Sequence, residues 1–159
     1  MPAEKHILDQ TVGDVLNTVV STPARVRSGD RLKAAIDAMI DVPITRKVYV
    51  MDDDDTLVGT ISVPTLLRQV GYRLGVRSTG IASLFRYISE VLREQVDDFM
   101  DPPITVTADT SLVEATRLMV ENRLNDLPVV DDDGHLVGEL NSFEILMKAR
   151  DLFDDGDGR

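Results

Sequence analysis

The alternation of apolar and polar residues changes period within the last third of the chain. Val129 and Val130 form a short apolar run, residues 131–134 supply turn residues, and residues 136–140 resume an extended pattern. From Ser142 onward, apolar residues return at intervals of three and four, which is the spacing of one helix face. The pattern predicts a strand, a tight turn, a second strand and then a helix.

The same order of patterns occurs earlier in the chain, so the sequence contains an internal repeat. Residues 48–50 form an apolar run, residues 52–55 are four aspartates, and residues 57–62 are extended before a helical stretch at 63–67. A helical stripe also precedes each hairpin with the same internal spacing: Leu32, Ala35 and Met39 in the first copy, and Leu112, Ala115 and Met119 in the second. Each half is therefore expected to contain a helix, a hairpin and a second helix.

Polar residues and glycines predict where these helices begin and end. Asp30 is the expected N-cap of a helix over residues 31–40. In the second copy, Ser111 and Glu114 have the spacing of a capping box. Gly71 is expected to end the helix that follows the first hairpin.

A further amphipathic stretch lies between the repeats and belongs to neither copy. Its apolar residues trace one helix face, namely Ile81, Leu84, Phe85, Ile88, Val91, Leu92 and Val96. One interpretation is a connector helix that packs on the repeat core. The other is a contact with a second subunit or a partner, because so apolar a stripe must be covered by something.

The repeats divide the chain into five segments. The start of the first repeat, residues 11–16, has a counterpart in residues 96–100. The expected segments are a lead-in at 1–10, repeat 1 at 11–70, a helical insertion at 71–96, repeat 2 at 97–149 and an acidic tail at 150–159.

Composition excludes several classes of protein. The 159 residues are 43% hydrophobic, which suffices for a core, and they include no cysteine, which excludes disulfides and thiol catalysis. No apolar run approaches the roughly 18 to 20 residues that cross a bilayer. The net charge of −11 argues against direct contact with nucleic acid. We therefore expect a cytoplasmic protein without a membrane segment.

Catalytic and metal-binding patterns are weak. The two histidines are His6 and His135, and no serine or aspartate is placed to complete a triad with either. The acidic run at 131–134 fails the spacing of a calcium loop: with Gly134 in the sixth place, Val129 and Leu140 would have to be ligands. The sequence predicts neither an enzyme nor a metal site.

Four segments of the second copy resemble a known domain: Asp98–Met100, Pro103–Val106, Leu127–Asp131 and Leu136–Gly138. They are similar to the cystathionine-β-synthase-type (CBS) domain, and the chain looks like a tandem pair of such domains, a regulatory unit also called a Bateman module. The first copy diverges, with Lys47–Val50 where Leu-Pro-Val-Val is typical. The resemblance implies an α/β (α+β) fold of two β-α-β-β-α units with approximate two-fold symmetry, plus the helical insertion.

The resemblance also implies two clefts between the repeats that hold AMP, ADP, ATP or S-adenosylmethionine, with no cofactor required. In the family, a Thr or Ser follows the glycine-containing strand, and an Asp three residues later takes the ribose hydroxyls. The matching residues here are Asn141 and Glu144 in the second copy, and Ser62 and Thr65 in the first. The second copy thus keeps a carboxylate. Asn141 and Glu144 are equally the residues of a helix cap, and both interpretations stay open.

Other positions follow from the same resemblance and from charge. The cleft is expected to be lined by Pro103, Ile104, Thr105, Leu127, Pro128 and Val129, with Ser62 and Thr65. Phosphate needs cations, for which the candidates are Arg123 in the second copy and Arg25, Arg46 and Lys47 in the first. The alternative is that these basic residues are simply solvated.

Three hypotheses remain at this point, and the third, a hydrolase of nucleotides, predicts product release from ATP, of which we expect none. The first is a sensor that binds an adenosine-type ligand and signals to an unidentified partner protein. The second is a degenerate CBS pair that serves as a dimerisation or interaction module without nucleotide. The resemblance also implies a homodimer.

Overall fold

The computed structural model describes residues 8–16, 22–42, 46–74 and 80–154, with the side chains of Arg73 and Leu74 left out. The chain divides into two compact units: Ala24–Pro103 form unit 2, while Met1–Pro23 and Ile104–Arg159 together form unit 1. Most of the predicted lead-in, the end of the acidic tail and residues 75–79 of the insertion lie outside the described residues.

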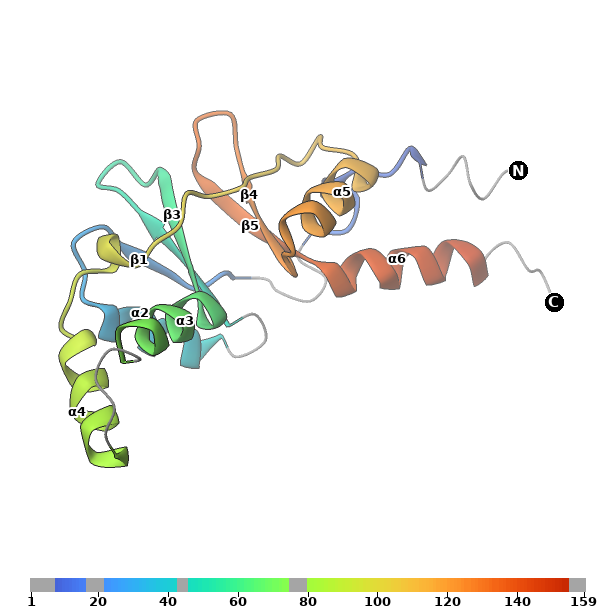
Figure 1. Ribbon diagram of the computed structural model, residues 1–159. Helices are drawn as coiled ribbons and strands as arrows, with labels where there is room; N and C mark the ends of the chain where they lie inside the picture. The colour runs from blue at the N-terminus through green and yellow to red at the C-terminus, as the bar shows by residue number, and fades with distance from the viewer. Residues whose placement is uncertain (1–7, 17–21, 43–45, 75–79, 155–159) are drawn as a thin grey trace. The chain divides into compact units, whose positions relative to one another are not determined.

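Unit 2 has the predicted order of elements (Figure 1). Its sheet has the order β1-β2-β3, with β1 (Arg25–Arg27) parallel to β2 (Lys47–Met51) and β2 antiparallel to β3 (Leu57–Ser62). Helix α2 (Leu32–Asp41) makes the crossover between the parallel strands, and α3 (Val63–Leu74) follows β3 directly. A crossover helix is what a parallel strand pair requires.

Unit 1 repeats this arrangement. Helix α5 (Leu112–Asn122) precedes the antiparallel pair β4 (Asp126–Val130) and β5 (Leu136–Asn141), and α6 (Ser142–Asp154) begins at the next residue. In the place of β1 there is a single parallel bridge between Val106 and Val129. The predicted pair of β-α-β-β-α units is confirmed.

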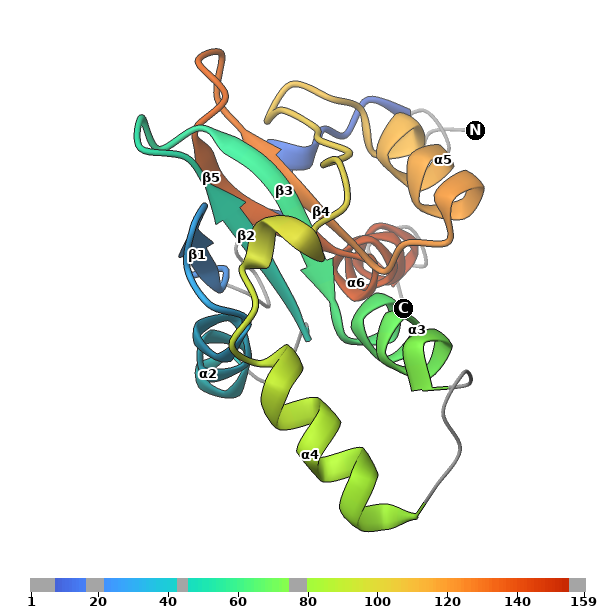
Figure 2. The same cartoon turned by 60° about the vertical axis from the view of Figure 1, so that its left-hand side comes forward.

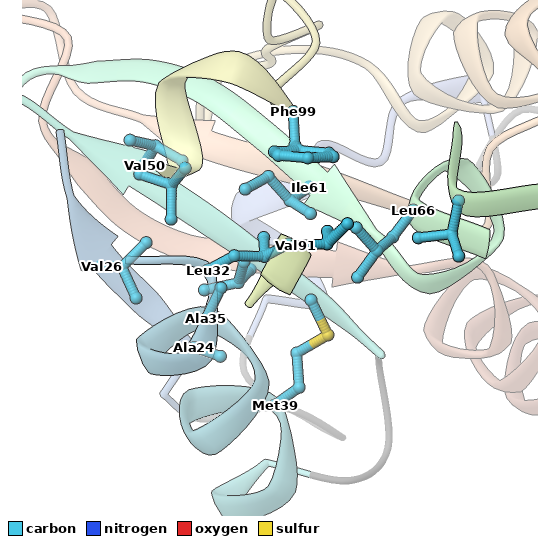
Figure 3. Packing of buried hydrophobic residues seen from close by; sticks show 13 residues of the cluster. Ala24, Val26, Leu32, Ala35, Met39, Val50, Ile61, Leu66, Val91 and Phe99 are labelled. Carbon is cyan, nitrogen blue, oxygen red and sulfur yellow. The ribbon is translucent and has the colours of Figure 1, made fainter. Parts of the chain in front are cut away.

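The core of unit 2 is mainly aliphatic, as expected of a chain with only 4% aromatic residues. The predicted stripe of α2, Leu32, Ala35 and Met39, is at most 7% exposed and packs against Val48 and Val50 of β2. Figure 3 shows the side chains of this stripe and of Val50 pointing toward one another, with the residues that it labels from β1, β3, α3 and α4 around them. The helical spacing of α2 and the two-residue spacing of β2 together create this core.

The short segment at the start of each predicted repeat packs in the core of the other half. The 3-10 helix η1 (Val12–Asp14) contributes Val12 to the core of unit 1, where it joins Leu127 and Leu140. The 3-10 helix η2 (Val96–Asp98) contributes Val96 to the core of unit 2. The compact units therefore do not follow the continuous segments 11–70 and 97–149.

Backbone carbonyls shortly before η2 accept hydrogen bonds from the start of α2. The Leu32 N–H donates to the Glu94 carbonyl at 2.8 Å, and the Lys33 N–H donates to the Leu92 carbonyl at 3.0 Å. The prediction that Asp30 caps α2 is wrong: the N-cap is Arg31, and the Asp30 carboxylate accepts the Arg27 N–H instead. A distant carbonyl has replaced the expected side-chain cap.

Two further helix boundaries differ from the prediction. Helix α3 continues to Leu74, so Gly71 lies inside the helix rather than at its end. Helix α4 (Ile81–Val91) ends before Val96, which lies in η2. In unit 1 the capping prediction holds in part: the Ser111 hydroxyl accepts the Glu114 N–H at 3.1 Å, whereas the Glu114 carboxylate binds Arg117.

Gly59 of β3 stands where a side chain would collide with Met100. A Cβ at Gly59 would lie 2.4 Å from Met100 Sδ and 2.9 Å from Met100 Cβ. Because this overlap forces side chains and backbone to shift, we expect Gly59→Ala to lower the free energy of unfolding by about 1 to 3 kcal/mol. Urea unfolding measures the change, and Met100→Ala should restore part of the loss.

Gly71 provides the matched control. It is exposed within α3, and a Cβ there would meet nothing within 4 Å. We expect Gly71→Ala to raise the free energy of unfolding by about 0.5 to 1 kcal/mol, because alanine is the better helix former. If both alanine variants changed stability in the same direction, the proposed collision with Met100 would be wrong.

Asp97 of η2 makes the stability of unit 2 depend on pH. Its carboxylate accepts hydrogen bonds from the Ser28 hydroxyl and, at 2.6 Å, from the Gly29 N–H. The Ser28 hydroxyl and then the Gly29 N–H lower the Asp97 pKa below its ordinary value of 3.8. Since the folded-state pKa is the lower one, the stabilisation is complete above the ordinary pKa and is lost as the pH falls through the folded value.

We therefore expect Asp97→Asn to be less stable than the parent near neutral pH. The difference should shrink as the pH falls below about 5, because the parent carboxylate then becomes progressively protonated and loses its charge. The measurement is the urea midpoint at each pH, with Asp53→Asn, in the exposed β2–β3 turn, as the control. A gap that stayed constant across this range would contradict the assignment.

Candidate functional site

The predicted ribose residues of unit 1 gather where β5 gives way to α6. Asn141 is the last residue of β5 and stands opposite Asp126, the first residue of β4. The Asn141 Nδ2 donates to Asp126 Oδ1 at 3.0 Å, and its Oδ1 accepts the Phe143 N–H at 2.8 Å. We call this region, residues 125–126 and 141–144, the acidic junction.

Glu144 lies in the first turn of α6 and is only 1% exposed. Its Oε1 accepts the Asn141 N–H at 3.4 Å, which is the long end of the hydrogen-bond range. Together with the bond from Phe143 to Asn141, this contact forms a helix cap, so capping is one role of both residues. Glu144 is also the carboxylate at the position where the CBS pattern has its ribose-binding aspartate.

The equivalent region of unit 2 is built differently, although the backbone is the same. Lys47 opens β2 opposite Ser62, just as Asp126 opens β4 opposite Asn141. The Ser62 hydroxyl donates to Thr65 Oγ1 at 3.0 Å, and the Thr65 N–H donates back to Ser62 Oγ at 3.3 Å. These two hydroxyls cap α3 without a carboxylate.

Basic residues lie near this hydroxyl pair in the chain. Arg68, one turn into α3, donates to Thr65 Oγ1 at 3.1 Å. The Arg46 carbonyl accepts the Val63 N–H at 3.1 Å, so Arg46 lies beside the start of the same helix. We call this region, residues 46–47, 62–65 and Arg68, the basic junction. Its basic side chains suit an anion.

The two junctions thus carry opposite charges at matching positions. Lys47 matches Asp126 in register, and Thr65 matches Glu144, three residues beyond the end of its strand. Sequence reasoning had singled out Lys47 and Glu144 but missed Asp126 and Arg68. The signal for Asp126 was that it occupies, in the second copy of the repeat, the position that Lys47 has in the first. The signal for Arg68 was its spacing of three residues from Thr65, which places both on one helix face.

The other predicted cations are distributed unevenly. Arg123 is exposed and ends α5 with a left-handed backbone, φ 54°, two residues before the acidic junction begins. Arg25 is exposed at the start of β1, beside Tyr49. Arg27, two residues further along β1, forms an ion pair with Asp55 at 2.6 Å, so its side chain is bound to the β2–β3 turn.

The predicted cleft-lining residues differ in what they can offer a ligand. Leu127 and Val129 are fully buried in the core of unit 1, so only their backbone groups are available. Ile104 is half-buried and packs against the same core, whereas Thr105 is exposed. Of the remaining two, Pro103 is half-buried and Pro128 is buried.

The acidic turn of unit 1 brings Asp131, Asp133 and His135 within 4.8 Å of one another. The Asp131 carboxylate accepts the N–H groups of His135 at 2.9 Å and Asp133 at 3.0 Å. The bond from the His135 N–H is the main cause that lowers the pKa of Asp131. Because Asp52 makes the matching pair of bonds in unit 2, with Asp54 and Thr56, this carboxylate is part of the turn.

A pair of β-α-β-β-α units with a polar strand-to-helix junction in each is the architecture of a tandem repeat module. A model of the CBS domain matches residues 96–151. A CBS domain-containing protein from Thermotoga maritima is 33% identical, with a TM-score of 0.71 over 88% of this chain and 94% of that one. The chain belongs to the family of CBS domain-containing proteins.

Two further similarities extend the comparison. CBSX2, a chloroplastic CBS domain-containing protein of Arabidopsis thaliana, is 31% identical over 157 residues, and the structure of its complex with AMP has a TM-score of 0.66 at 30% identity over 91% of this chain and 98% of that one. Inosine-5′-monophosphate dehydrogenase of Halobacterium salinarum is 30% identical over 140 residues. The chain spans 63% of the length of CBSX2 and 23% of the dehydrogenase.

Within the described residues, none of the helices has the length and apolar character that a bilayer crossing requires.

Proposed function

We propose that this protein is a regulatory sensor that binds an adenosine-type ligand, with AMP, ADP, ATP and S-adenosylmethionine as the candidates. The observation that carries the proposal is the acidic junction, where Glu144 and Asn141 occupy the positions of the CBS ribose motif and are held by the start of α6. A carboxylate suits ribose because it can accept hydrogen bonds from two neighbouring hydroxyls.

The phosphate part of the ligand requires positive charge, which the acidic junction lacks. The basic junction would supply it through the side chains of Arg46, Lys47 and Arg68. The basic junction of unit 2 is therefore the candidate site for a phosphate group. The AMP complex of CBSX2 supports a nucleotide over an uncharged nucleoside.

The ligand would act by changing the population of two arrangements of the module, since a ligand shifts an equilibrium only through a difference in affinity. The signal would pass to a partner protein, and the protein would act as a homodimer in the cytoplasm. No catalytic role is part of the proposal, because the described polar groups of both junctions act as caps and binding groups.

A second candidate is an interaction module that has lost nucleotide binding. Thr65 favours this candidate, because the basic junction has no carboxylate for a ribose. The two candidates differ in one measurable property. Titration calorimetry with the four proposed ligands should give binding heat for at least one of them if the protein is a sensor.

The role of Glu144 gives the sharpest test of the sensor. We expect Glu144→Ala to weaken AMP binding by about 2 kcal/mol, roughly thirtyfold in Kd, because it removes charged acceptors from the ribose hydroxyls. Thr65→Ala, at the matching position of unit 2, should change Kd much less, because it leaves the ribose contacts intact and removes only an acceptor of Arg68. Calorimetry on both variants measures this, and equal effects would refute the assignment of the ribose to Glu144.

Because Glu144 also caps α6, a second variant separates binding from folding. Glu144→Gln keeps an oxygen for the Asn141 N–H but removes the negative charge. We expect it to melt close to the parent in the absence of ligand and still to bind AMP more weakly. Binding that recovered fully in Glu144→Gln would mean that the charge has no role.

The basic junction predicts which part of the ligand Arg46 and Arg68 contact. We expect Arg46→Gln and Arg68→Gln each to weaken AMP binding by roughly tenfold, since each removes a charge-assisted bond to phosphate. Adenosine, which has no phosphate, should bind these variants as it binds the parent. Arg150→Gln, an equal change of charge on the exposed part of α6, is the control. A parallel loss of adenosine binding would contradict a phosphate role.

A further inference from the structure

Asp126 is a buried acid at the first position of β4. It is 4% exposed, and its register partner across the hairpin is Asn141, the last residue of β5. The Asn141 Nδ2 donates to Asp126 Oδ1 at 3.0 Å. Figure 2 shows the start of β4 and the start of α6 at the same end of this hairpin. The carboxylate of Asp126 therefore lies where the hairpin passes into the helix that carries Glu144.

The contacts of Asn141 allow one orientation of its side-chain amide. The Nδ2 faces the carboxylate of Asp126, and the Oδ1 accepts the Phe143 N–H at 2.8 Å. A carboxylate can only accept hydrogen bonds, and a backbone N–H can only donate. The reversed amide would place an acceptor against the carboxylate and a donor against the N–H group, so both bonds would be lost. Asp126 thus determines which end of the amide reaches α6.

The same amide holds the first turn of α6. The Phe143 N–H is one of the groups that a helix start leaves without an acceptor in its own helix. The next residue, Glu144, is 1% exposed, and its Oε1 accepts the Asn141 N–H at 3.4 Å. The direction in which Glu144 presents its carboxylate depends on this turn. Since Asn141 holds the turn and Asp126 orients Asn141, the position of Glu144 depends on Asp126.

The fold itself does not require an acid at this position. Lys47 occupies the matching position of unit 2. In both units the first N–H of the following helix donates to the carbonyl just before the strand, at 3.1 Å in unit 2 and at 2.8 Å in unit 1. The backbone of the junction is therefore held in the same way beside a lysine and beside an aspartate. The acid of unit 1 is explained by Glu144 rather than by the fold.

We propose that Asp126 is a positioning residue that, through Asn141, holds Glu144 in the direction that the two ribose hydroxyls require. This role of Asp126 rests on the proposed function, in which Glu144 accepts both hydroxyls. A carboxylate that binds two neighbouring hydroxyls must face both of them, and a misaligned one keeps at most one of the two bonds. Asp126 therefore controls the preference for ribose over 2′-deoxyribose.

Calorimetry with AMP and 2′-deoxy-AMP measures this preference. We expect the parent to bind AMP at least about tenfold more tightly, since the deoxy sugar lacks one bond to a charged acceptor. Asp126→Ala removes the acceptor of the Asn141 amide, and we expect it to bring the two Kd values within about twofold of each other. Asp126→Asn keeps an oxygen for Asn141 and should keep most of the preference. The control is Asp132→Ala, an equal change of charge in the exposed β4–β5 turn.

A double-mutant cycle tests whether Asp126 acts through Asn141. Asn141→Ala should abolish the preference by itself, and adding Asp126→Ala should then change each Kd by less than about twofold, because the two residues act as one unit. Additive losses would mean that Asp126 acts by another route and would overturn the proposal. Asp126→Lys is a second variant without an acceptor, and it carries the test if circular dichroism shows that Asp126→Ala is unfolded. We expect it to lose the preference as well.

Hydrogen exchange at the Phe143 amide reports the positioning without any ligand. We expect Asp126→Ala to accelerate this exchange at least about tenfold, since the Asn141 Oδ1 is no longer held against the N–H, with Asp132→Ala close to the parent. Unchanged exchange in Asp126→Ala would overturn the proposal.

The binding results separate this role from the sensor function. If Asp126→Ala weakens AMP and 2′-deoxy-AMP equally, so that the preference remains, Asp126 has only a structural role and the proposal fails while the sensor function stands. A parent that binds both nucleotides alike, or neither, would also overturn the proposal. The sensor function itself fails only if the parent binds none of its four candidate ligands.

Discussion

One backbone contact, present once in each unit, determines how the two repeats are built. The Leu32 N–H donates to the Glu94 carbonyl in unit 2, and the Leu112 N–H donates to the Gln10 carbonyl in unit 1. A helix start leaves N–H groups that need acceptors, and here a segment distant in sequence provides them. The contact anchors η2 and η1 in the cores of their units. It also brings the end of α4 onto unit 2, because only two residues separate Val91 from Glu94.

The elements could be predicted from the sequence because each has a local signal. The spacing of Leu32, Ala35 and Met39 identifies the buried face of α2, and the aspartates at 52–55 identify a turn. The backbone contact at Glu94 has no such signal, since any residue offers a carbonyl. For this reason Asp30 was wrongly predicted to cap α2. Gly71 was predicted to end α3, but the helix continues past it on solvent-facing positions.

The residues of the junctions were predictable in position but not in their environment. The alignment of the repeats showed that Asn141 and Glu144 match the positions of a family motif. The register of β4 and β5 then places Asp126 beside Asn141. The sequence does not reveal how deeply these residues are buried. Only the structure shows that Glu144 is 1% exposed and that the Leu127 side chain lies in the core. Whether a carboxylate is a cap or a binding group depends on that environment, because both roles use the same oxygen atoms.

The duplication has been modified at two places, and both changes make the halves complementary rather than equal. At the junctions, Lys47 and Thr65 in one half match Asp126 and Glu144 in the other, so one half suits an anion and the other a diol. At the helices, α4 packs on the core of unit 2, whereas the groove between α5 and α6 of unit 1 is open. An exact duplicate would offer two identical ligand sites and two identical grooves. In this chain each half instead presents what the other lacks, so the two junctions suit different parts of a ligand.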